Sequence, residues 1–83
     1  MKDESFGEHL RKERVKRGLT AETLAASCGI SRSYVTLIEN GRRLPGKKHI
    51  LKIAAALGIQ SGTVLNWYLE DMSRKIRSHL EQA

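Results

Sequence analysis

The feature that most constrains this chain is a pair of short helical patterns joined through only three residues, Cys28–Ile30. The apolar residues that mark one face of each pattern are Ala21, Leu24, Ala25 and Cys28 in the first and Tyr34, Val35 and Ile38 in the second. Thr20 and Ser31 are suitable N-caps for the two helices, and Gly29 can adopt a backbone turn that a side chain would strain. Because the connection is so short, the pattern predicts a helix-turn-helix whose second helix projects at a steep angle.

Three further helices are predicted around this pair. The residues that mark one face are Phe6, Leu10 and Arg14 in the first helix of the chain and Ile50, Leu51, Ile53, Ala54 and Leu57 in the fourth. Gly18 and Gly58 supply their stops, and no Gly or Pro interrupts the stretch from Thr63 to about Leu80. The 83 residues therefore predict a single all-α domain, with a core over about residues 5–60 and an extended C-terminal helix over about 63–80.

Charge and composition narrow the range of functions. Fifteen Lys and Arg against nine Asp and Glu give a net charge of 15 − 9 = +6, which favours an anionic partner. Cys28 and three scattered histidines lack zinc-ligand spacing, and no nucleophile, base and orienting group occur together, so we expect no metal, no cofactor and no enzymatic activity. The longest apolar run, Ile53 to Leu57, is far shorter than the ~20 residues that cross a bilayer, and residues 1–20 lack a signal-peptide core. These features predict a soluble, cytoplasmic protein with no membrane partner.

Two specific motifs lie between Gly18 and Ile59, Leu-Ala-x3-Gly-Ile-Ser and Ile-Glu-Asn-Gly. With these motifs the chain resembles, over about residues 5–60, the Cro and phage-repressor type of helix-turn-helix domain, also called the XRE family. The resemblance implies a five-helix, lambda-repressor-like DNA-binding domain of a transcription regulator, similar in size to restriction-modification controller proteins. In one departure, Ala21 stands where the family often carries a Gln that braces the recognition side chains, so we expect base recognition to depend more on Arg32.

The second helix of the pair is the predicted recognition helix, and its exposed N-terminal side chains can reach base edges in a major groove roughly 12 Å wide. The predicted base contacts are Arg32, Ser33, Thr36 and Leu37. The predicted phosphate contacts are Thr20, Tyr34, Asn40, Gly41, Arg42, Arg43, Lys47 and Lys48. By resemblance, residues 40–43 match the loop that family members lay against phosphates. The alternatives are that the basic loop is a solvated connection, that Arg32 holds a phosphate, and that Tyr34 shields the core.

Two charges are predicted to point inward. Arg14 follows Leu10 by four positions on a buried stripe, and Glu39 follows Val35 by four on the recognition helix. Because an isolated buried charge costs several kcal/mol, we expect Arg14 and Glu39 to pair and to tie the two helices together. The resemblance supports this expectation, since relatives pair Arg and Glu at these positions.

The C-terminal helix carries a second apolar seam, made of Leu65, Leu69, Met72, Ile76 and Leu80. Its second half has no earlier core left to cover, so the seam predicts a homodimer interface; the alternative is that this half frays or folds back. A dimer would bind double-stranded DNA at a palindromic operator with half-sites ~34 Å apart. Two rival functions are an antitoxin-like interaction module, whose DNA binding is autoregulatory, and sequence-indifferent DNA packing.

Overall fold

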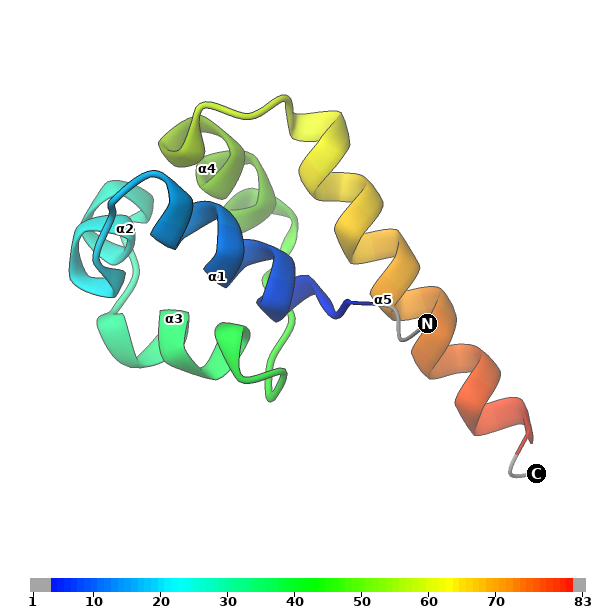
Figure 1. The fold of residues 1–83 in the computed structure, drawn as a ribbon. Helices are drawn as coiled ribbons and strands as arrows, with labels where there is room; N and C mark the ends of the chain where they lie inside the picture. Colours follow the sequence, from blue (N-terminus) through cyan, green and yellow to red (C-terminus); the bar gives the residue numbers. More distant parts are fainter. Residues whose placement is uncertain (1–3, 82–83) are drawn as a thin grey trace.

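The computed structural model describes residues 4–81 and consists of five α-helices joined by short loops (Figure 1). The helices are α1 (Phe6–Lys16), α2 (Ala21–Cys28), α3 (Arg32–Glu39), α4 (Lys47–Leu57) and α5 (Ser61–Glu81). No strand occurs between residues 4 and 81, and the predicted all-α class with five helices is confirmed.

The core lies where all five helices meet. α2 packs on α3 and α4, α4 packs on α5, and α1 packs on both α3 and α5. The largest fully buried side chains are Phe6, Leu10, Leu24, Cys28, Val35, Ile38, Ile53 and Val64. One residue of the predicted α4 stripe is misplaced, because Leu51 is 56% exposed. The buried face of α4 is formed by Ile50, Ile53, Ala54 and Leu57, and Leu51, about 100° round the helix from Ile50, lies outside that face.

Local sequence sets the ends of the helix-turn-helix as predicted. The side-chain oxygens of Thr20 and Ser31 accept hydrogen bonds from the backbone N–H groups of Thr23 and Tyr34, at 3.0 and 3.1 Å. Gly29 ends α2 with φ at +68°, a left-handed conformation that a side chain would strain. Both predicted caps and the predicted glycine turn are therefore confirmed.

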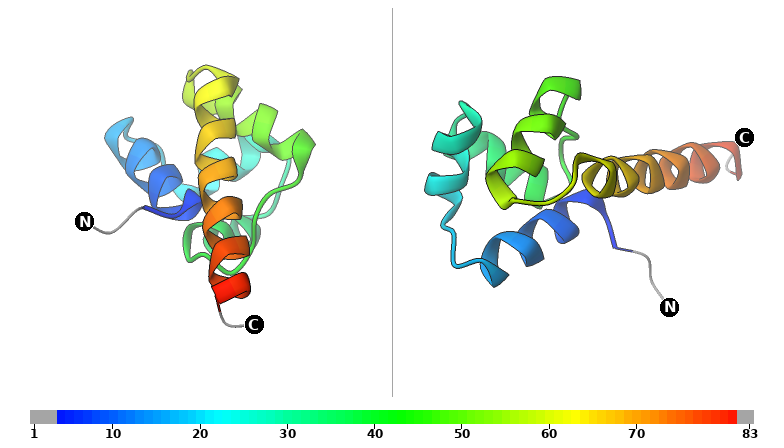
Figure 2. Two further views of the ribbon diagram at one scale, coloured as in Figure 1. Left: turned by 90° about the vertical axis from the view of Figure 1, so that its right-hand side faces the viewer. Right: turned by 90° about the horizontal axis from the view of Figure 1, so that it is seen from above.

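The last helix begins at Ser61, two residues before the predicted start, and includes Gly62 in its first turn. The Gln60 carbonyl accepts hydrogen bonds from the N–H groups of Thr63 and Val64, so the chain is already helical there. Gly62 is tolerated in this turn, and a Cβ atom at its position would have no neighbour within 4 Å. Val64 and Trp67 pack the first half of α5 against the core, and the Trp67 ring meets the Phe6 ring edge-on, with centroids 6.2 Å apart. The second half projects away from the bundle, and residues 75–81 are all exposed (Figure 2).

A buried carboxylate joins α5 to the start of α1. Asp71 is 5% exposed, and its Oδ2 accepts a hydrogen bond of 2.9 Å from the backbone N–H of Phe6, the first residue of α1. Arg74 and Lys75 lie 3.6 and 4.0 Å from the Asp71 Oδ1 atom, so two cations balance the buried charge. Asp71 thus satisfies an N–H group that has no partner inside its own helix, and it fixes α5 against α1.

The start of α1 also touches the end of α3. A Cβ atom at Gly7 would lie 2.2 Å from the Ile38 carbonyl oxygen and 2.7 Å from the Glu39 carbonyl oxygen. No side chain fits in that space, so Gly7 sets how closely α1 approaches α3.

We predict that Gly7→Ala lowers the free energy of unfolding by about 1–3 kcal/mol, because the new methyl group collides with two backbone carbonyls. Urea unfolding followed by circular dichroism measures the change. Gly62→Ala is the matched control, since it lies in a helix with open space around it and should raise stability by about 0.5–1 kcal/mol. Equal stability of Gly7→Ala and the unsubstituted protein would show that α1 and α3 are not held this close.

Candidate nucleic-acid interface

Helix α3 has one buried face and one free face. Val35 and Ile38 are buried in the core. The four predicted base-contact residues are exposed on the other face, and together they line one shallow hollow: Arg32, Ser33, Thr36 and Leu37. A helix is narrow enough to enter a major groove, so this face has the shape and the side chains to meet base edges.

The direction of α3 is set at its C-terminal end by Arg14. The Arg14 guanidinium donates to both carboxylate oxygens of Glu39, from Nε at 2.7 Å and from Nη2 at 3.1 Å. Its Nη1 donates to the Leu19 carbonyl oxygen at 2.8 Å, directly before the Thr20 cap of α2. The two side chains are only 14% and 9% exposed, and the hydrogen bonds to Glu39 raise the pKa of Arg14. The structure thus brings Arg14 and Glu39 together in a two-point ion pair that joins α1 to both helices of the helix-turn-helix.

The loop after α3 carries the predicted phosphate contacts. Asn40, Gly41, Arg42 and Arg43 are exposed, and Gly41 has φ at +77°, which turns the chain away from α3. Lys47 and Lys48 are exposed at the start of α4. Among the described residues, Arg42, Arg43, Lys47 and Lys48 have no ion-pair partner. Four cations without an ion-pair partner among residues 4–81 therefore follow the exposed face of α3. Such a cluster of charge is suited to the phosphate backbone of a nucleic acid.

The other two predicted phosphate residues are placed differently. Thr20 is exposed at the start of α2, where its hydroxyl already accepts from the Thr23 N–H. Tyr34 is half-buried against the core, with its ring edge-on to His49 at 5.4 Å. Tyr34 therefore packs against the core, and its contact with a phosphate stays a prediction.

Sequence reasoning missed one residue of this surface, Glu22. Its Oε1 accepts a hydrogen bond of 3.2 Å from Nη1 of Arg32, so the second residue of α2 forms an ion pair with the first residue of α3. The two side chains are 72% and 68% exposed. The short turn places the starts of α2 and α3 close together. The sequence signal for this pair was an acidic residue at the start of α2 and a basic residue at the start of α3.

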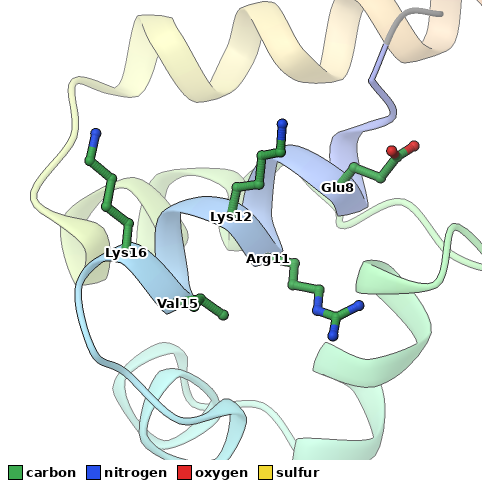
Figure 3. Close-up of a pocket in the computed structure, with 5 residues that line it drawn as sticks. All are labelled: Glu8, Arg11, Lys12, Val15 and Lys16. Carbon is green, nitrogen blue, oxygen red and sulfur yellow. The ribbon is translucent and has the colours of Figure 1, made fainter.

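A separate cationic surface lies on the outer face of α1. Figure 3 shows Lys12 and Lys16 pointing toward the side of α5, while Arg11 and Val15 point toward the helix-turn-helix. Lys12 hydrogen-bonds to Glu4, and this bond raises the pKa of Lys12. No residue of α3 lines this surface, so it is distinct from the face that carries Arg32.

The apolar seam on α5 is largely solvent-exposed. The exposed fractions are 43% for Leu65, 51% for Leu69, 54% for Ile76 and 67% for Leu80, and Met72 is half-buried. Val64, Trp67 and Asp71, on another face of α5, make its contacts with the core. The five seam residues therefore form an apolar strip along α5 that residues 4–81 leave largely exposed, with Met72 partly covered.

Residues 4–81 contain neither a metal-binding cluster nor a membrane-spanning helix. No group of three His, Cys, Asp or Glu side chains in this range is placed to hold a metal ion. None of the five helices combines the length and the apolar character needed to cross a membrane.

Comparison with known proteins agrees with this geometry. Residues 10–63 match the model of a family described as helix-turn-helix. The chain is 47% identical over 57 residues to the HTH-type transcriptional repressor RghR of Bacillus subtilis (strain 168), covering 68% of this chain and 42% of RghR. It therefore spans less than half the length of that relative.

Two solved structures show the same fold. The restriction-modification controller protein C.AhdI from Aeromonas hydrophila superposes with a TM-score of 0.68 at 44% identity, covering 71% of this chain and 89% of C.AhdI. The P22 c2 repressor, solved with a synthetic operator, superposes with a TM-score of 0.73 at 22% identity, covering 78% of this chain and 98% of that one. The predicted lambda-repressor-like architecture is confirmed by these superpositions.

We predict that Glu39→Gln lowers the free energy of unfolding by about 3–5 kcal/mol, because it leaves the Arg14 charge poorly compensated in a mostly buried place. Thermal unfolding measures the loss. Glu22→Gln is the matched control, since it removes the same charge from an exposed pair, which contributes below about 1 kcal/mol. Similar small losses in both variants would show that the Arg14–Glu39 pair does not hold α3 in place.

Proposed function

Because this chain belongs to the helix-turn-helix family of XRE-type transcriptional regulators, we propose that it binds double-stranded DNA sequence-specifically, as a homodimer on a palindromic operator. The observation that carries the proposal is the exposed face of α3 followed by Arg42, Arg43, Lys47 and Lys48, four cations without an ion-pair partner among residues 4–81. Such a surface offers both the side chains that read bases and the charge that holds phosphates. We place this activity in the cytoplasm.

In the proposed complex the two parts of the surface have different tasks. Arg42, Arg43, Lys47 and Lys48 hold the sugar-phosphate backbone and set the register of α3 in the major groove. Arg32 then reads a guanine through its O6 and N7 acceptors, and Leu37 contacts a thymine methyl group. Bound protein acts by occupancy: it blocks or recruits RNA polymerase and performs no reaction on the DNA.

Dimerisation is proposed from the coverage that one domain can achieve. A single α3 spans only a few base pairs, so specific affinity needs two copies on successive major grooves. The exposed strip from Leu65 to Leu80 is apolar, lies on one helix and extends beyond the bundle, so a second copy can cover it by symmetric pairing. Two-fold symmetry then requires a palindromic operator, with half-site centres about 34 Å apart.

The likeness to C.AhdI refines the proposal. The matched segment covers 89% of C.AhdI, a restriction-modification controller protein. We propose that this chain is a regulator of the same class as C.AhdI.

Competition between duplexes tests the proposed sequence specificity. We expect selection from a random duplex pool to yield a consensus that the protein binds at least about a thousandfold more tightly than random duplex at fixed salt. Arg32→Ala should relax the preference at one position by about 1–3 kcal/mol. Arg43→Gln should weaken binding to all duplexes alike and reduce the salt-dependence slope by about 0.9. Equal affinity for the selected and random duplexes would contradict the proposal and favour sequence-indifferent packing.

Sedimentation tests the proposed dimer. Ile76→Glu with Leu80→Glu should give a monomer with lost operator affinity, because two charges would be buried in an apolar interface. Both residues lie in the projecting half of α5, so the melting temperature of the core should change little. The charge-matched control, Arg77→Gln with Ser78→Glu, changes exposed residues outside the strip and should remain dimeric. A dimeric Ile76→Glu, Leu80→Glu variant would place the interface elsewhere.

A further inference from the structure

The surface that would face DNA contains one exposed carboxylate. Between Thr20 and Lys48 the acidic residues are Glu22 and Glu39, and Glu39 is held by Arg14 in a mostly buried place. Glu22 is 72% exposed at the start of α2. An exposed carboxylate on a surface that binds a polyanion weakens binding, and the contacts of Glu22 indicate a role that offsets this cost.

We propose that Glu22 is a positioning residue that makes Arg32 selective for a base edge over a phosphate. This inference rests on the proposed function of the α3 surface. Its basis is the ion pair across the helix-turn-helix, in which Glu22 Oε1 lies 3.2 Å from Arg32 Nη1. The neighbouring Ala21 has no polar side-chain atom, so among the first two residues of α2 the bond to Arg32 falls to Glu22.

The geometry of a guanidinium explains how one bond can orient Arg32 and leave it able to read a base. The group carries five N–H donors in a planar fork, and the Glu22 bond uses one donor of Nη1. The remaining donors include a pair that can bind the O6 and N7 atoms of guanine together. A side chain already held near that pose loses less rotational freedom when it binds.

Charge explains the selectivity. An arginine at the start of a recognition helix can bind either a phosphate or a base edge. A phosphate carries a full negative charge and is repelled by the Glu22 carboxylate, whereas the guanine acceptors are neutral atoms. Glu22 therefore weakens the phosphate-bound pose of Arg32 more than the base-bound pose, and it exchanges some overall affinity for discrimination.

Glu22 also lies in the first turn of α2, where a negative charge stabilises the helix N-terminus. A purely structural role of that kind predicts a lower melting temperature without Glu22 and no change in base preference. Base preference is therefore the deciding measurement, and three substitutions separate the roles. Glu22→Ala removes the carboxylate, Glu22→Asp keeps the charge at the helix end but draws it back by one methylene, and Glu22→Gln keeps an acceptor oxygen without the charge.

The probe is the duplex selected by the unsubstituted protein, together with its three single-base variants at the position that Arg32→Ala affects. We expect Glu22→Ala and Glu22→Asp to reduce the discrimination at this position about twofold to fivefold, the size of an exposed ion pair's contribution. Glu22→Gln should retain part of the discrimination, and Glu22→Ala should bind random duplex more tightly than the unsubstituted protein does. In the Arg32→Ala background, Glu22→Ala should cause no further loss, since the residue that Glu22 positions is absent.

The possible results are distinguishable. Full discrimination in Glu22→Ala overturns the inference, as does full discrimination in Glu22→Asp, while the proposed DNA binding stands. A consensus unaffected by Arg32→Ala also overturns it, because Arg32 then reads no base. If the unsubstituted protein prefers no sequence at all, the proposed function fails and this inference fails with it.

Discussion

The position of α3, the proposed recognition helix, depends on the hydrogen bonds of one guanidinium. Arg14 projects from α1 and donates to Glu39 at the end of α3 and to the Leu19 carbonyl before α2. Apolar packing alone is non-directional and would let α3 rotate or slide in its groove. A planar fork with three short hydrogen bonds accepts only one arrangement. The mostly buried location makes the arrangement costly to break, since separating the pair would leave two charges with little solvent.

Helix α1 extends this constraint to the rest of the molecule. Near its C-terminal end Arg14 holds the helix-turn-helix, and at its N-terminal end the Phe6 N–H donates to the buried Asp71 of α5. Gly7 lets the same end of α1 lie directly against the carbonyl groups that close α3. The exposed face of α3 and the apolar strip of α5 are therefore connected through one short helix, and neither can shift without disturbing a buried polar contact.

Most of the fold was predictable because its signals are local. The caps at Thr20 and Ser31, the stop at Gly29 and the spacing of apolar residues each depend on neighbours within one or two turns. The inward-pointing charges of Arg14 and Glu39 were also within reach, since each lies on a stripe whose other members are apolar. The exposed α3 face followed from the same periodicity, and the basic loop followed from the run of Lys and Arg that Pro45-Gly46 interrupts.

The features that sequence reasoning missed depend on contacts between distant elements. Gly7 interrupts no pattern, and its reason is the approach of α3, more than thirty residues later. Asp71 looks like one more polar residue of a long helix until α1 is placed beside it. Glu22 was overlooked because its partner belongs to the next helix, and Leu51 was misplaced because periodicity alone does not show how wide a buried face is.

The unbroken course of α5 has a mechanical consequence for the proposed dimer. α5 is a single helix from Ser61 to Glu81, and its buried residues Val64, Trp67 and Asp71 fix it to the core that also holds α3. In the proposed dimer, the angle at which the two α5 helices cross would set the distance between the two α3 helices. Substitutions along the strip could then alter which half-site spacing is tolerated without touching a residue that meets DNA.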